Sequence, residues 1–215
     1  MNGANAARWI PLSGIVFVAL FAVVFTLTGD SPAPSDSDAE YLAYYGDSGN
    51  RAQEIAAFFM IAIGALFFVW FLTDLRERLR GVESESHGLS TLAFGAGLVS
   101  VTLLLGAACV GIGPAIAAED SDVFQLDPDL ARFTSSTSYL FLVSSTMIAA
   151  GLIAATSVLA LRTGVLPAWL GWVGLVVAAA ALLAFAWFPI FAYLAWILVT
   201  SIVLVLRPMQ QSQPA

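Results

Sequence analysis

The chain contains no lysine, one cysteine and one histidine, and charged residues make up only 11% of its 215 residues. The absence of lysine excludes Schiff-base chemistry and a P-loop nucleotide site, since both need its amine. The single cysteine, Cys109, permits neither an internal disulfide nor a cluster of thiolate metal ligands. The single histidine, His87, excludes a haem held between two histidines. Several classes of cofactor enzyme are therefore ruled out by composition.

The shortage of charge also excludes an ordinary soluble domain, in which about 25% of residues are charged and about 45–50% are apolar. Here 60% of residues are hydrophobic and the mean hydropathy is +0.88. Such a composition predicts an all-α transmembrane helical bundle that occupies residues 1–215 as a single domain. Since the sequence has no run of basic residues, we expect no nucleic-acid partner.

Uncharged apolar segments predict six transmembrane helices. Crossing a hydrocarbon core of about 30 Å takes about 20 helical residues. The last uncharged stretch, residues 163–206, is twice that length, and Pro189 near its middle favours a break into two helices. The predicted spans are residues 9–27, 56–72, 90–113, 139–161, 168–187 and 190–206.

The arginines predict the orientation of the bundle. Even numbers of crossings separate six of the eight: Arg8, Arg76, Arg78, Arg80, Arg162 and Arg207. Because cytoplasmic loops are rich in Arg and Lys, both chain ends are expected in the cytoplasm, in a multi-pass protein of the bacterial inner membrane. The alternative is that the first apolar segment is a cleaved secretory signal, which would leave five helices and an external N-terminus.

The two outer loops hold eleven of the fifteen acidic residues and carry signals for short amphipathic helices. Ser37 and Glu40 have the spacing of a capping box, and Gly46 is a helix stop that can adopt the left-handed conformation. In the second loop, Asp127 and Pro128 read as an N-cap followed by proline at the first helical position. Such helices could form a lid, a partner surface or a simple cover for the bundle.

Charged residues at the predicted membrane interfaces are the remaining candidates for a site. Arg51 and Glu54 lie at the outer end of the second span and Asp74 at its inner end, where solvated side chains are the simplest expectation. A buried Arg51–Glu54 ion pair that faces the bundle is the alternative. The spacing of His87 to Glu83 and Glu85 fits no zinc motif.

We therefore predict no catalytic, metal-binding or cofactor-binding residue. Cys109 is expected to be a small buried hydrophobic residue. Tryptophans should mark the interfaces, with Trp196 packed inside the bundle; those expected at the inner interface are Trp9, Trp70, Trp169 and Trp172, and the one at the outer interface is Trp187.

Two segments carry a resemblance to a family. RTGVLPAWLGWVGL, from Arg162 to Leu175, and LTDLRERLRG, from Leu72 to Gly81, are similar to features of an actinobacterial family of six-helix integral membrane proteins of unknown function. The resemblance implies the same six-helix bundle and assigns no residue a role.

The missing catalytic groups predict a non-catalytic membrane protein that scaffolds or regulates a membrane complex, with the lipid bilayer and other proteins as partners. The alternative is a small-molecule transporter, or its substrate-binding subunit, for an apolar or uncharged ligand. A water-accessible cavity lined by Ser144, Ser145, Thr156 and Trp196 would favour the transporter, whereas a dry bundle favours the scaffold. An enzyme that uses His87 or the outer carboxylates is the third hypothesis.

Overall fold

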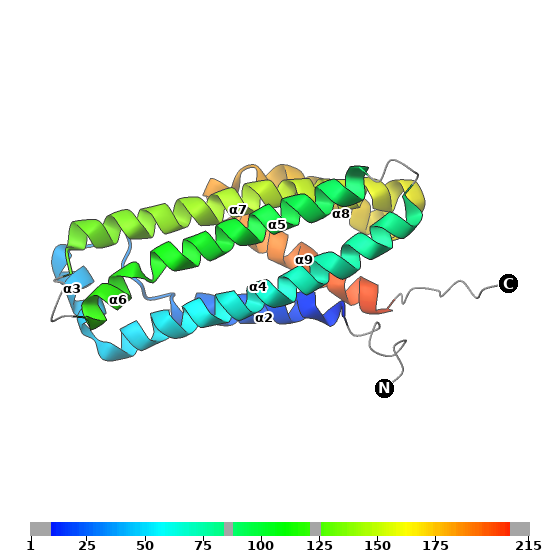
Figure 1. The fold of residues 1–215 in the computed structure, drawn as a ribbon. Coiled ribbons are helices and arrows are strands. Elements are labelled where there is room, and N and C mark those ends of the chain that lie inside the picture. Colours follow the sequence, from blue (N-terminus) through cyan, green and yellow to red (C-terminus); the bar gives the residue numbers. More distant parts are fainter. Residues whose placement is uncertain (1–9, 84–87, 121–125, 207–215) are drawn as a thin grey trace, which may run out of the picture.

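The computed structural model describes residues 10–83, 88–120 and 126–206, and the regular secondary structure of this part of the chain is all helical, with turns between the helices (Figure 1). The prediction of an all-α protein is confirmed. The helices in chain order are α2 (Leu12–Leu27), α3 (Asp38–Gly46), α4 (Ser48–Val82), α5 (Gly88–Gly111), α6 (Gly113–Glu119), α7 (Pro128–Thr163), α8 (Ala168–Ala181), the 3₁₀ turn η1 (Ala184–Ala186) and α9 (Phe188–Leu206).

Four helical segments are long and apolar enough to cross a membrane: α4, the continuous stretch of α5 and α6, α7, and α9. The two other apolar helices, α2 and α8, have 16 and 14 residues. Each of the six predicted spans overlaps one of these helices. However, α4 and α7 run well past their apolar segments, and the 36 residues of α7 measure about 54 Å.

The long uncharged stretch near the end of the chain breaks as expected, but not at Pro189. Helix α8 already ends at Ala181, and Pro189 is the second residue of α9, where a missing N–H costs nothing. Tyr139 of α7 holds the intervening turn: its hydroxyl donates to the carbonyl of Phe185 (2.9 Å), and its ring stacks on Trp187 with centroids 5.1 Å apart.

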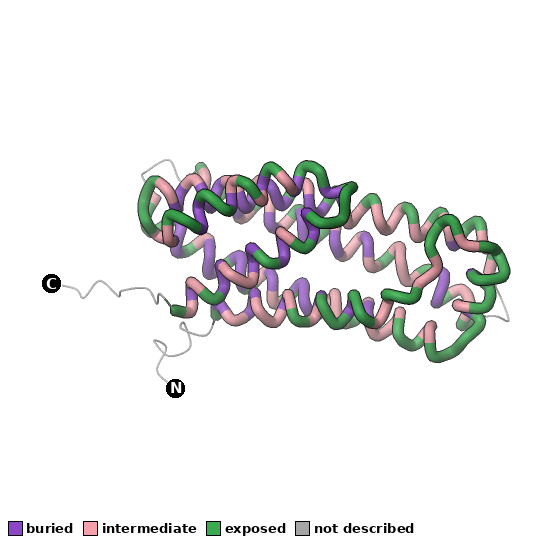
Figure 2. The backbone as a smooth tube through the Cα atoms, turned by 180° about the vertical axis from the view of Figure 1, so that it is seen from behind, coloured by how far each residue is buried: buried purple, intermediate pink, exposed green. Residues whose placement is uncertain are grey.

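The long helices lie side by side along one axis (Figure 1). We call one end of the bundle the cap: it comprises α3, α6 and the first turns of α4 and α7. At the opposite end, α2 begins and α4, α7 and α9 end. Figure 2 shows that buried residues gather in the half near this opposite end, where α8 and α9 pack on the bundle.

Both predicted helix starts in the loops are confirmed. Ser37 and Glu40 form a reciprocal capping box at the start of α3, and the side chain of Asp127 caps α7 just before Pro128. Helix α3 does end at Gly46, but this glycine is not left-handed; the glycine with a positive φ in the described residues is Gly164 (φ 71°), which ends α7.

Apart from Leu170, which is buried, the inward face of helix α8 consists of small residues. Gly171, Gly174 and Ala178 are buried, whereas Trp172 and Val176 are 65% and 70% exposed. Membrane helices commonly pack in this way, because lipid solvates large apolar side chains and small residues let helix backbones approach closely.

The closest approach on α8 is at Gly174. A methyl group added there would collide with the hydroxyl of Ser157 on α7 and with the indole nitrogen of Trp196 on α9. Neither of these two buried polar atoms has a hydrogen-bond partner among the described residues. The three helices therefore meet through a contact that only glycine permits.

We predict that Gly174→Ala lowers the stability of the protein in detergent by about 1–3 kcal/mol, because overpacking forces neighbouring side chains to shift. Thermal unfolding followed by circular dichroism would measure this loss. Adding Ser157→Ala should restore part of it, because the colliding hydroxyl is gone. The matched control is Gly95→Ala on α5, where a methyl group meets no atom within 4 Å; equal destabilisation by both glycine variants would contradict this packing.

Candidate functional site

The most extensive polar arrangement in the described chain is the cap, in which the short helix α3 bridges α4, α6 and α7. Tyr41 and Tyr45 of α3 are 0% and 3% exposed and pack against Ala115 of α6 and Ala131 of α7. This forms a small hydrophobic core separate from the main one. Helix α3 is thus an integral part of the cap and not a loosely attached loop.

Arg51 of α4 fastens the C-terminal end of α3. Its Nη1 donates to the carbonyls of Tyr45 and Gly46, both at 2.9 Å, and its Nε pairs with Glu119 at the end of α6 at 2.7 Å. A guanidinium group suits this position because the carbonyls at a helix C-terminus lack partners and carry partial negative charge. One side chain therefore joins three helices.

Arg132 of α7 fastens the other end of α3. Its Nη2 donates to the carboxylate of Asp38 (2.6 Å) and to the carbonyl of Asp36 (2.8 Å), and its Nη1 pairs with Asp129 (2.9 Å). The guanidinium carbon also lies 4.9 Å from the centre of the Tyr41 ring. The hydrogen bond that Arg132 donates to the carboxylate of Asp38 raises the pKa of Arg132 above its usual value. The two arginines of the cap each hold one end of the same helix.

Glu54 forms a third connection between α3 and α4. Its carboxylate accepts hydrogen bonds from the hydroxyls of Ser31 (2.6 Å) and Tyr44 (3.1 Å). Burial raises the pKa of Tyr44 to about 12, so the phenol remains a donor at neutral pH. Arg51 and Glu54 are therefore not paired with each other, and the alternative of an Arg51–Glu54 ion pair is wrong.

At the opposite end of the bundle, Asp74 and Arg78 of α4 form a buried ion pair. The Nε of Arg78 lies 2.8 Å from Asp74, the two side chains are 5% and 2% exposed, and Nη1 donates to the carbonyl of Leu204 on α9. The expectation that Asp74 is solvated is wrong. Burying two charges costs free energy unless they pair, so this pair fixes how α4 meets the end of α9.

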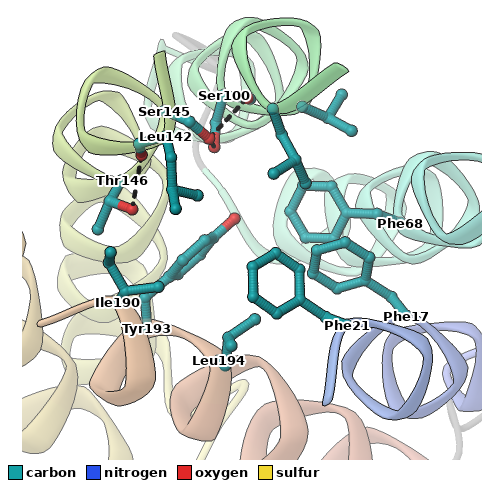
Figure 3. Close-up of a pocket in the computed structure, with 12 residues that line it drawn as sticks. Phe17, Phe21, Phe68, Ser100, Leu142, Ser145, Thr146, Ile190, Tyr193 and Leu194 are labelled. Atoms are coloured by element: carbon teal, nitrogen blue, oxygen red, sulfur yellow. Dashed lines mark hydrogen bonds between the residues drawn. The ribbon is translucent and has the colours of Figure 1, made fainter. Parts of the chain in front are cut away.

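A small cavity lies near the middle of the bundle (Figure 3). One wall carries the rings of Phe17, Phe21 and Phe68, and the hydroxyls of Ser100 and Ser145 form a hydrogen-bonded pair at 3.1 Å on the other. Its volume is about 10 Å³, and holding one water molecule takes roughly 10–15 Å³. The cavity in this conformation has room for a single water molecule at most.

The four residues predicted to line a ligand cavity do not converge. Ser145 lines the cavity just described, whereas Ser144 is exposed. Thr156 and Trp196 are 0% and 3% exposed in other parts of the core and do not line this cavity. The burial of Trp196 confirms the prediction for that side chain.

Several expectations for single residues can also be compared. Cys109 is exposed on the surface of α5, so the expectation that it is buried is wrong. His87, Glu85 and Trp9 lie outside the described residues. Glu83 accepts hydrogen bonds from the backbone N–H groups of Leu89 and Ser90 and so caps the start of α5. The described tryptophans expected at the interfaces are exposed: Trp70, Trp169, Trp172 and Trp187.

A scan against models of protein families found no match to this chain, and searches of curated proteins and of solved structures found no similar protein.

We predict that Arg132→Gln loosens α3, because Asp38 and the carbonyl of Asp36 then lose a charged donor. Hydrogen–deuterium exchange should show faster exchange of the amides of α3, by about 10-fold if the loss is about 1.4 kcal/mol. Arg51→Gln should act similarly at the other end of the helix. The matched control is Arg80→Gln, because Arg80 is exposed and makes no ion pair among the described residues. Unchanged exchange in α3 in both cap variants would contradict the role of the arginines.

Proposed function

We propose that this chain is a non-catalytic integral membrane protein of the bacterial inner membrane that scaffolds or regulates a membrane complex, and that it presents the cap to a partner outside the cytoplasm. The observation that carries the proposal is the cap itself. It extends beyond the apolar lengths of α4 and α7, and ion pairs and a core of its own hold its helices together.

The proposed orientation has six spans, with α2 and α8 as the two shorter ones and both chain ends in the cytoplasm. Helix α2 has 16 residues and would cover about 24 Å, while α8 and η1 together would cover about 27 Å. Both lengths are near the thickness of a bacterial hydrocarbon core, and membranes adapt to small mismatches at modest cost. In the proposed orientation, the arginine-rich end of α4 lies in the cytoplasm and the cap lies outside.

The charge of the cap supports a role in recognition. Arg51 and Arg132 pair with three carboxylates of the cap, and the exposed carboxylates outnumber these two arginines. Exposed apolar side chains lie among them, with Leu42, Leu130 and Phe133 being 47%, 46% and 68% exposed. A rigid acidic surface with apolar side chains provides the orientation and selectivity that a protein partner needs. The exposed carboxylates in the helices of the cap and directly beside them are Asp38, Glu40, Asp47, Glu119, Asp120, Asp127 and Asp129.

The cavity is the feature that a carrier would require, and its size supports the scaffold instead. A site for a small organic molecule typically has several hundred cubic ångströms, far more than the roughly 10 Å³ found here. Transport by this chain would require the helices that line the cavity to separate, namely α2, α4, α5, α7 and α9.

Photo-crosslinking in cells tests the proposal. A photoreactive amino acid at Leu42 or Phe133 of the cap should give a discrete adduct of higher mass with a partner protein, and Arg132→Gln should reduce the adduct at Leu42. The same amino acid at Val176, which is 70% exposed on α8, is the control and should give no such adduct. Absence of an adduct from both cap positions would contradict the proposal.

Purification in mild detergent followed by mass spectrometry of bound small molecules separates the carrier from the scaffold. The carrier predicts a co-purifying compound that is lost when Ser145→Leu fills the cavity. The scaffold predicts that Ser145→Leu leaves the crosslinked adduct of the cap unchanged.

A further inference from the structure

Arg76 differs from the other described arginines at its end of the bundle. Arg78 is buried against Asp74, whereas Arg80 and Arg162 are exposed. Arg76 is partly buried, and its guanidinium group lies over the ring of Phe94 on α5, 4.8 Å from the centroid. Its Nε is enclosed and has no hydrogen-bond partner in the part of the chain that the structure describes. The guanidinium group is therefore held against Phe94, and only the part of the side chain that stays accessible is open to a ligand.

The nearby carboxylates do not neutralise Arg76. Asp74 is paired with Arg78, and Glu83 caps the first turn of α5. Glu77 is exposed and forms no ion pair with a described residue. A guanidinium group that is fixed, partly buried and without an ion pair among the described residues is complementary to an oxyanion, and its planar donors match a phosphate group particularly well.

The position of Arg76 along α4 indicates where that oxyanion would come from. The apolar part of α4 ends at Leu72, and Trp70, which is 62% exposed, marks the level of the membrane interface. Arg76 lies four residues beyond Leu72, which is about 6 Å along the helix axis. This is the level of lipid headgroups in the proposed orientation, beside the contact of Arg76 with Phe94 of α5.

We propose that Arg76, fixed by Phe94, binds the phosphate of an anionic phospholipid from the cytoplasmic leaflet where α4 packs against α5. Phe94 orients the guanidinium group so that it faces the headgroup, and Arg80 contributes only a general attraction. The proposal rests on the membrane orientation given above, but it does not require a protein partner. Lipid binding by the purified chain can therefore fail while the cap crosslinks, or the reverse.

Native mass spectrometry of the full chain in detergent, titrated with phosphatidylglycerol or phosphatidylcholine, tests this site. The wild-type chain should retain phosphatidylglycerol in preference to phosphatidylcholine. Arg76→Gln should weaken phosphatidylglycerol binding about tenfold, as expected for the loss of a charge-assisted hydrogen bond. Arg80→Gln, which removes the same charge one turn away, is the matched control and should change binding less than about twofold, since exposed charges interact weakly.

Two further arms keep the result interpretable. Phe94→Leu retains the charge but releases the guanidinium group, and it should lower phosphatidylglycerol binding without changing net charge; this variant also serves if Arg76→Gln does not fold. Excess inorganic phosphate should not displace the lipid. Equal losses in the Arg76 and Arg80 variants, no effect of Phe94→Leu, displacement by inorganic phosphate or no preference for the anionic lipid would each overturn the proposal.

Discussion

The structure depends on one constraint: inside a hydrocarbon layer, no water is present to satisfy a polar group. Backbone N–H and C=O groups find partners by forming helices. Charged side chains either lie at the ends of the bundle or pair with each other. Asp74 and Arg78 satisfy each other within a single helix, while Arg51 and Arg132 lie at the cap. Both the helical architecture and the sorting of charge follow from this constraint.

Much of the fold could be predicted because this constraint leaves a local record in the sequence. Apolar runs located all six apolar helices, and the caps at Ser37 and Asp127 located two helix starts. The break before α9 was predicted, but its position was not. A proline indicates that a helix cannot continue through it, whereas the place where α8 ends depends on how Tyr139 of another helix holds the turn.

The polar contacts of the cap could not be predicted, because their partners are far apart in the sequence. Arg51 and Glu119 are separated by 68 positions, and Arg132 and Asp38 by 94. The Asp74–Arg78 pair did have a local signal: the two residues are four positions apart and share a helix face with Phe71 and Leu75, which are buried. The expectation for Asp74 came only from its place at the end of a span. It did not use the helix face that Asp74 occupies, and the pair was therefore not predicted.

The orientation of the bundle is the claim on which the cap and the lipid site both depend, and labelling of cysteines measures it most directly. In a chain carrying Cys109→Ser, one cysteine would replace exposed Ala43 in α3, and another would replace Val82 at the far end of α4. An impermeant maleimide added to intact cells should modify the cysteine at position 43, and the cysteine at position 82 only after the membrane is opened. Modification of position 82 in intact cells, with protection of position 43, would contradict the account.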